Sequence, residues 1–200
     1  MKTVAFRDFE ERDIDFIYRC KNNEQLNSMI VGEFRQFSYE ESVKWVHGCM
    51  GEHEKYKFWA ICTNDEKKNI VGWVSLSEID RKNKTACHHG LVIGDPSYRD
   101  GISMFEAMLF SMEYAFKTLK IQRLYGSCLA EHKISPSLLK SLGFSLEKRN
   151  RDLCFKNNRY YDVLDFALLD TDYYSNINRG SYKLPNLIKS FVKYTRNNDE

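Results

Sequence analysis

The stretch LVIGDPSYRDGISMFEAMLFSMEYAFKTL, residues 91–119, decides the fold predicted for this chain. Its apolar start at 91–93 and the turn residues at 94–96 predict a buried strand that ends at a turn. Ser103, followed three residues later by Glu106, has the spacing of a capping box and predicts the start of a helix. One apolar helical face follows, with residues three and four apart: Met104, Phe105, Met108, Leu109, Met112, Ala115, Phe116 and Leu119.

The loop between this strand and this helix is a candidate anion-binding site. The first amides of a helix have no partners within the helix, and both they and the helix dipole favour negative charge. Arg99 adds a positive charge to the loop. An ordinary connection between a strand and a helix has the same pattern, so the residues alone leave both interpretations open.

The composition predicts a folded chain in a reducing compartment. With 200 residues, of which 42% are hydrophobic, the chain can bury the core of one domain. Its 30 basic and 28 acidic residues leave a net charge of +2, which gives no bulk attraction to nucleic acid or membrane. The six cysteines form no CxxC pair, which favours reduced core thiols over disulfides or a zinc site. Since the sequence shows no signal segment or long apolar run, we expect a cytoplasmic protein without metal, nucleic-acid or membrane partners.

The expected elements alternate in an order that suits one α+β domain. Strands are predicted at residues 3–7, 57–62, 70–77, 85–93, 121–129, 145–155 and 160–169. Besides the long helix after residue 103, helices are predicted at 11–21, from a second capping box at Ser38 to Gly48 or Gly51, and over 136–142, where Gly143 supplies the glycine after the helix end. Residues 24–37 mix a short helical pattern with Gly32, and Asn157-Asn158 predict a hairpin turn between the last two strands. A last amphipathic helix carries Leu184, Leu187, Ile188, Phe191 and Val192.

Residues 96–99, the glycine just after them, Glu106-Ala107 and residues 113–116 resemble the acetyl-CoA motif of the GNAT superfamily of N-acetyltransferases. The resemblance runs from about residue 4 to residue 172 and implies the α+β GNAT fold, with a central mixed, mostly antiparallel twisted sheet flanked by helices. It implies a GNAT domain at 1–172 and a C-terminal extension at 173–200 with one amphipathic helix. That helix packs on the body, forms a dimer contact or covers the substrate site.

The resemblance also implies acetyl-CoA as co-substrate and no metal. In the family, amides of a glycine-containing loop hold the cofactor's pyrophosphate, and the backbone of the preceding strand polarises the thioester carbonyl. Here the usual glycine positions hold Ile102 and Met104, whose side chains must point away from the phosphates, and Gly101 is the glycine of the loop. The implied cofactor-binding residues are Leu91, Val92, Ile93, Arg99, Asp100, Gly101, Ile102, Ser103, Met104, His132 and Ser135.

Two catalytic residues, His88 and Ser135, are implied by the same resemblance. His88 stands where the family often has a glutamate base, and an imidazole with a pKa of about 6.5 can accept a proton at neutral pH. Alternatively, His88 and His89 point to opposite faces of the strand, one lining a groove and one hydrogen-bonded in the core. Ser135 matches a serine of the branch that acetylates N-terminal residues of ribosomal proteins, and either bonds the leaving sulfur or pantetheine arm or only caps a helix. His132 replaces that branch's asparagine and either bonds the cofactor or lies exposed in a loop.

The implied function is transfer of an acetyl group from acetyl-CoA to a primary amine of a small molecule or a protein N-terminus. Two alternatives stay open. Residues 83–85 and 93–95 also resemble acetyltransferases of nucleotide-linked amino sugars. The altered glycine loop, and Leu139 at the position of the general-acid tyrosine of other branches, also fit a CoA-binding domain without catalysis. The expected partners are the amine substrate and, where the C-terminal helix forms a dimer contact, a second copy of the chain.

Overall fold

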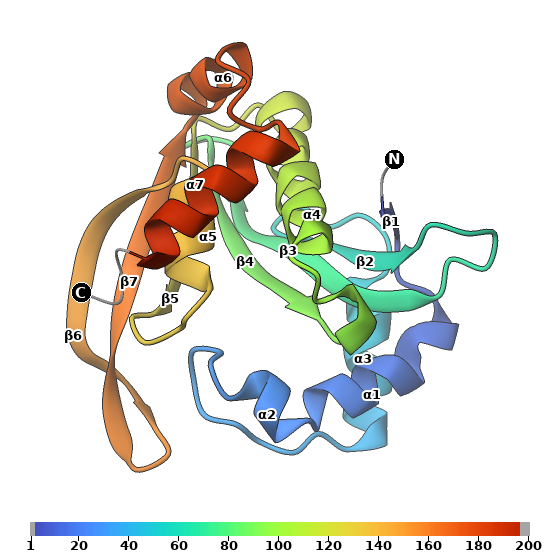
Figure 1. Cartoon of the computed structure of the whole chain (residues 1–200). Helices are drawn as coiled ribbons and strands as arrows, with labels where there is room; N and C mark the ends of the chain where they lie inside the picture. The colour runs from blue at the N-terminus through green and yellow to red at the C-terminus, as the bar shows by residue number, and fades with distance from the viewer. Residues whose placement is uncertain (1–2, 197–200) are drawn as a thin grey trace.

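The computed structural model describes residues 3–196, which form one seven-stranded mixed sheet with helices on both faces (Figure 1). The strand order is β1-β2-β3-β4-β5-β7-β6, and only the β4–β5 pair among these described strands is parallel. The α+β class and the mostly antiparallel sheet predicted from the sequence are therefore confirmed. The strands are β1 (Val4–Arg7), β2 (Lys57–Thr63), β3 (Ile70–Asp80), β4 (Thr85–Ile93), β5 (Arg123–Leu129), β6 (Ser145–Lys156) and β7 (Arg159–Leu169).

The described helices agree with the predicted ones except at the C-terminal end. The helix α6 is absent from the prediction, and the expected domain boundary at residue 172 falls inside it. The long helix is also not α-helical to its end, because its last turn, Tyr114–Thr118, is a π-helix. The α-helices are α1 (Ile14–Lys21), α2 (Glu24–Asn27), α3 (Tyr39–Cys49), α4 (Ile102–Glu113), α5 (Ser135–Ser141), α6 (Asp170–Asn178) and α7 (Leu184–Arg196).

The two largest hydrophobic cores of the described residues lie on opposite faces of the sheet. The larger core lies between the sheet and the helices α4, α5 and α7, and it includes Val74, Phe105 and Leu187 (Figure 1). The smaller core lies on the other face, where α1 and α3 pack against Trp73. Neighbouring residues of a strand point to opposite faces, so Trp73 and Val74 of β3 belong to different cores. Leu187 is 1% exposed, which shows that α7 packs on the body.

Several predicted turns and caps form as expected. Ser38 Oγ accepts a hydrogen bond from the Glu41 amide at 3.1 Å, and Glu41 Oε2 accepts one from the Ser38 amide at 2.7 Å, so the second capping box is confirmed. Asn157 and Asn158 have φ of 51° and 58°, as a two-residue hairpin turn between β6 and β7 requires. Gly143 has φ of 90° just beyond α5, where a residue with a Cβ is strained.

The first predicted capping box, from Ser103 to Glu106, is wrong. Glu106 Oε2 instead accepts hydrogen bonds from Thr3 Oγ1 at 2.8 Å and from the Thr3 amide at 2.9 Å, tying the start of β1 to α4. The Ser103 hydroxyl is buried without a hydrogen-bond partner among residues 3–196. The acceptor at the helix start is Asp100, whose Oδ1 lies 2.9 Å from the Ile102 amide and 3.0 Å from the Ser103 amide. The long-range contact with Thr3 therefore uses the Glu106 carboxylate that the local pattern assigned to the helix cap.

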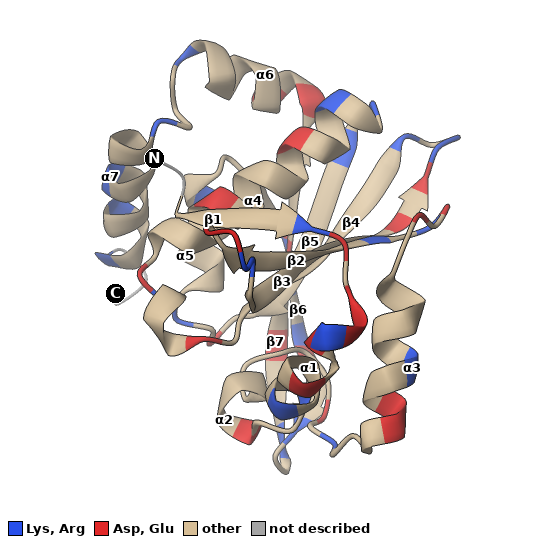
Figure 2. Cartoon of the chain, turned by 90° about the vertical axis from the view of Figure 1, so that its right-hand side faces the viewer, with Lys and Arg blue, Asp and Glu red and all other residues tan. Residues whose placement is uncertain are grey.

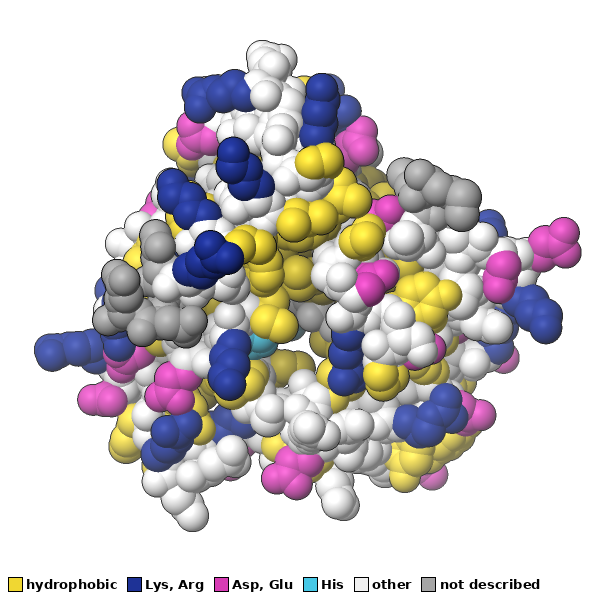
Figure 3. Space-filling model, viewed as in Figure 1, with side chains coloured by type: hydrophobic (Ala, Val, Ile, Leu, Met, Phe, Trp, Pro, Cys, Tyr) yellow, Lys and Arg dark blue, Asp and Glu magenta, His cyan; other side chains and the backbone are white. Residues whose placement is uncertain are grey.

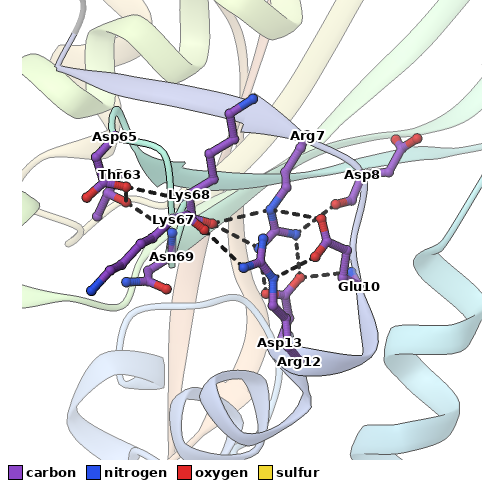
Figure 4. Close-up of polar contacts among 10 residues, drawn as sticks. All are labelled: Arg7, Asp8, Glu10, Arg12, Asp13, Thr63, Asp65, Lys67, Lys68 and Asn69. Atoms are coloured by element: carbon purple, nitrogen blue, oxygen red, sulfur yellow. Dashed lines mark hydrogen bonds and ion pairs between the residues drawn. The ribbon is translucent and has the colours of Figure 1, made fainter.

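A buried ion pair fixes the N-terminal strand to the following helix (Figure 4). Arg7 donates two hydrogen bonds to Asp13, at 2.7 and 2.8 Å, in the paired geometry that makes such contacts strong. The Asp13 side chain is 1% exposed and also accepts from the Glu10 amide at 2.9 Å. Arg7 reaches the Lys68 carbonyl in the β2–β3 turn as well, so one guanidinium joins three segments.

Charges of both signs are interspersed on the elements of the face shown in Figure 2. This mixture agrees with the small net charge of +2. No helix within residues 3–196 is long and apolar enough to cross a membrane.

Candidate active site

The parallel strands β4 and β5 separate part-way along their length. They pair at Thr85, Ala86 and Cys87 of β4, and the described pairing between them ends there. The β3–β4 pairing continues to Ile93, so residues 88–93 keep one partner strand and lose the other. Gly126 lies where the strands diverge, and a Cβ there would lie 3.1 Å from the His88 carbonyl oxygen. The backbone groups on the free edge of β4 are therefore available to another molecule.

A groove opens where the two strands diverge. It consists of a cavity of about 620 Å³ and an adjoining one of about 300 Å³, and both are lined by residues 88–92, His132 and Ser135. The smaller cavity extends to Arg99 and Met104, and the larger one extends across the aromatic residues of the other face. Figure 3 shows the molecule hollowed near its centre, with apolar side chains inside the hollow and Lys and Arg side chains at its rim.

A β-bulge places both histidines of β4 at the groove. Gly90 pairs with Ser75 and His88 pairs with Leu76, so His89 is the extra residue, and the strict alternation expected from the sequence fails there. His88 is 9% exposed and His89 is exposed, yet both line the larger cavity. The alternative in which only one of the two histidines lines a groove therefore does not hold.

The surroundings of His88 determine its tautomer and its charge. Its Nε2 lies 3.1 Å from Ser111 Oγ on α4, and that hydroxyl donates to the Met108 carbonyl at 2.9 Å. Since the serine proton is already used, the imidazole donates through Nε2, and Nδ1 keeps its lone pair. Burial lowers the pKa of His88 to about 4, so the ring is neutral at physiological pH.

The start of α5 is built differently from the prediction. Ser135 is the first residue of the helix and Ile134 is its N-cap, so the Ser135 side chain does not cap it. His132 does so instead, because its Nδ1 accepts hydrogen bonds from the amides of Ile134 and Ser135 at 3.2 and 3.1 Å. Burial lowers the pKa of His132, and the neutral ring carries its proton on Nε2. His132 and Ser135 both line the two cavities.

The start of α4 lies at the far end of the smaller cavity. Arg99 donates to the carbonyls of Ile93 and Gly94, at 3.0 Å each, and so lies folded over the end of β4. Gly101 is the N-cap with φ of 81°, a conformation that favours glycine. Met104 lines this cavity. The Asp100 carboxylate already accepts from two of the first amides of the helix.

Comparison with known sequences decides the family. A family model described as the acetyltransferase (GNAT) domain matches residues 3–145. The chain belongs to the GNAT acetyltransferase family.

Several GNAT relatives are known by name. The [ribosomal protein uS5]-alanine N-acetyltransferase of Escherichia coli K12 is 30% identical over 108 residues, which are 54% of this chain and 55% of that protein. The chain thus spans about half the length of this relative. The spermidine N(1)-acetyltransferase of Vibrio cholerae is 24% identical over 85% of this chain and 95% of that protein. A crystal structure of the Vibrio cholerae spermidine N-acetyltransferase with CoA and spermine has a TM-score of 0.76 at 22% identity, covering 87% of this chain and 99% of that one.

The GNAT groove gathers many of the residues singled out in the sequence. Those that line the smaller cavity are His88, Leu91, Val92, Ile93, Arg99, Met104, His132 and Ser135. Asp100, Gly101, Ile102 and Ser103 lie at the adjoining helix start and line neither cavity.

The aromatic end of the GNAT groove was not predicted from the sequence. Lys21, Phe37, Trp45 and Trp73 line the larger cavity, although they come from separate elements. No local spacing relates these residues, so no sequence signal could have grouped them. Within residues 3–196, no group of three or more His, Cys, Asp or Glu side chains is arranged to hold a metal ion.

Proposed function

We propose that this GNAT protein transfers an acetyl group from acetyl-CoA to a primary amine of a small molecule or a protein N-terminus. The observation that carries the proposal is the groove at the divergence of β4 and β5, which the free backbone edge of β4 borders. Backbone N–H groups fixed in a groove can polarise a carbonyl without reorganising during the reaction. The match to the family and the amine-acetylating relatives support the same reaction.

The smaller cavity suits the thioester arm of acetyl-CoA. Its walls include Leu91, Met104, Met108, Leu138 and Leu139, which offer an apolar channel of about 300 Å³. The channel runs from the histidines of β4 to Arg99, which places a cation at the end where a diphosphate would bind. The fit at the α4 amides depends on Asp100, because its carboxylate must release them before an anion can use them.

His88, Ser135 and His132 are proposed to move or hold protons during the reaction. Acetyl-CoA supplies the acetyl group: as the amine nitrogen bonds the carbonyl carbon, the C–S bond breaks, the amine gives up one proton and the leaving thiolate takes one up. We assign His88 Nδ1 as the acceptor of the amine proton, since Nε2 already donates to Ser111. Ser135 and the Nε2–H of His132 line the groove and are assigned to donate hydrogen bonds to the leaving sulfur or the adjoining arm.

The experiment that tests this proposal combines binding with turnover. Acetyl-CoA is expected to raise the melting temperature of the purified protein, because a ligand that binds only the folded state stabilises it. Thiol release is then followed with a panel of primary amines. His88→Ala should lower kcat more than it weakens acetyl-CoA binding, whereas Lys82→Ala, on an exposed turn, should change neither. Absence of both a melting shift and thiol release would overturn the proposed function.

A homodimer and a cytoplasmic location complete the proposal. The outer face of the β6–β7 hairpin exposes Leu146, Leu153, Phe155 and Tyr160, and β6 is the edge strand of the sheet. The middle of β6 is charged at 147–149 and 151–152, so we assign the contact to the exposed apolar side chains of the hairpin, which suit a second copy. Six free cysteines in the described chain support a reducing compartment. Sedimentation velocity tests the dimer, and Leu153→Lys should yield a monomer.

A further inference from the structure

The larger cavity contains an ammonium group that no carboxylate of residues 3–196 neutralises. Lys21, the last residue of α1, lines this cavity and is half-buried. Its Nζ lies 4.4 Å from the ring centroid of Trp45, 5.3 Å from that of Phe37 and 5.7 Å from that of Trp73. Among residues 3–196, no carboxylate lies within ion-pair distance of Lys21, and no hydrogen-bond acceptor contacts it. The ammonium is therefore held by aromatic rings alone.

The other charges of this cavity do not offset Lys21. Arg35 lies over the Phe37 ring at 3.9 Å and pairs with Glu41 at 2.8 Å. Lys156 is buried and donates to the carbonyls of Asn27 and Ile30 at 2.9 and 2.8 Å. The acidic residue in the lining is Glu33, which is exposed, and both histidines of β4 also line this cavity. Three cationic side chains thus line the cavity with one carboxylate.

This arrangement favours an anion and disfavours a second cation. Aromatic rings attract an ammonium, but they carry no net charge and leave its positive potential in the cavity. Burial lowers the pKa of Lys21, and an anion beside it would reverse that effect. A polyamine would place further positive charge next to Lys21 and Lys156, and like charges repel strongly where water is excluded.

We propose that the acceptor is an amine that also carries an anionic group, a carboxylate or a phosphate, and that Lys21 binds this group at the aromatic end of the larger cavity. The inference rests on the proposed function, because it takes the amine to be acetylated at the β4 end of the same cavity. It makes Lys21 a specificity-determining residue, and the rings of Trp45 and Trp73 cover the part of the acceptor next to the anion.

Matched pairs of acceptors test the inference. Thiol release is measured with amino acids and their amides, with amino-sugar phosphates and the parent amino sugars, and with spermidine. The wild-type protein should prefer the anionic member of at least one pair by about tenfold to a hundredfold in kcat/KM, as expected for one charge-assisted contact. The pair that shows the preference tells a carboxylate from a phosphate. Lys21→Met should narrow this difference and Lys21→Arg should keep most of it, while Lys82→Met, at an exposed turn, should leave it unchanged.

A second measurement covers the case in which no acceptor of the panel turns over. N-acetyl amino acids and N-acetyl sugar phosphates are titrated while tryptophan fluorescence is followed, because Lys21 contacts the rings of Trp45 and Trp73. Saturable quenching in the wild type that Lys21→Met abolishes supports the inference. Faster acetylation of spermidine or of neutral amines overturns it and leaves the proposed function intact. If the protein binds acetyl-CoA but shows no fluorescence response and no anion preference, the inference is overturned and the proposed function stands. Failure to bind acetyl-CoA overturns the proposed function, and the inference that rests on it falls with it.

Discussion

In the proposed binding mode the Asp100 carboxylate and the diphosphate of acetyl-CoA compete for the same amides, so replacing Asp100 should strengthen acetyl-CoA binding. Asp100 Oδ1 accepts from the Ile102 and Ser103 amides at 2.9 and 3.0 Å, at the mouth of a 12-residue helix. The helix dipole favours negative charge there, whether a side chain or a ligand supplies it. The carboxylate must leave these amides before a ligand can use them. Asp100→Ala removes that requirement.

The expected size of the effect follows from the value of a helix cap. Loss of a carboxylate that accepts from the first amides of a helix costs about 1 kcal/mol of folding stability, within a range of about 0.5–2. For a chain of this length, that loss lowers the melting temperature of the ligand-free protein by about 2–4 °C. In Asp100→Ala, acetyl-CoA no longer has to displace the carboxylate from the amides, so its dissociation constant should fall about fivefold to tenfold.

Calorimetric titration of acetyl-CoA into the wild type and Asp100→Ala measures this change. Asp95→Ala is the matched control, because Asp95 lies in the same loop but accepts from the Ser97 amide, at 2.9 Å, outside α4. The control variant measures how much the loss of one negative charge in this loop by itself strengthens the binding of an anionic ligand. If Asp100→Ala binds acetyl-CoA no more tightly than the control, the α4 amides do not hold the diphosphate and the assigned binding mode is wrong.

Three further predictions follow from buried groups. Asp13→Ala should lower the free energy of unfolding by about 3 kcal/mol in urea titrations, since it leaves a mostly buried guanidinium without its partner, whereas Glu113→Ala, in an exposed pair, should cost below about 1 kcal/mol. Burial lowers the pKa of His88 to about 4, below its unfolded value, so its contribution to stability is present above pH 6.5 and is lost as the pH falls toward 4. Between pH 7 and pH 5 this group should lower the free energy of unfolding by about 2 kcal/mol. A His88→Asn variant whose free energy of unfolding changes with pH as steeply as that of the wild type would contradict the assignment. Lys156→Met should speed amide hydrogen exchange at residues 27–32 and raise KM for the acceptor, because Lys156 donates to two carbonyls of that segment. Unchanged exchange at these residues would show that the contact does not order the loop.

The sequence predicted elements where the information is local. Strand β4 was predicted with both of its observed ends, and the Ser38 capping box and the Asn157-Asn158 turn formed as expected. These features depend on periodicity or on hydrogen bonds between residues a few positions apart. Helix α6 was missed because its apolar residues are few and only Tyr173 among them is buried.

Contacts between distant segments overrode the local patterns at the site. Glu106, which the local pattern assigned to the capping box, instead accepts hydrogen bonds from Thr3, 103 positions away. Asp100 accepts from the first amides of α4 in its place. The bulge at His89 turned a predicted alternation into two groove-lining histidines. At Ser135, an imidazole three residues earlier replaced the predicted hydroxyl cap.

The sequence by itself determined the order of the strands and of the helices other than α6, the family and the donor of the proposed reaction, because periodicity and a contiguous motif carry that information. Only the tertiary structure decided where β4 leaves β5, which charges face the larger cavity and which amides Asp100 occupies. Lys21, Trp45 and Trp73 belong to α1, α3 and β3, and packing alone brings them together. The proposed selection of the acceptor depends on such contacts, because burial and charge at a site depend on every element packed around it.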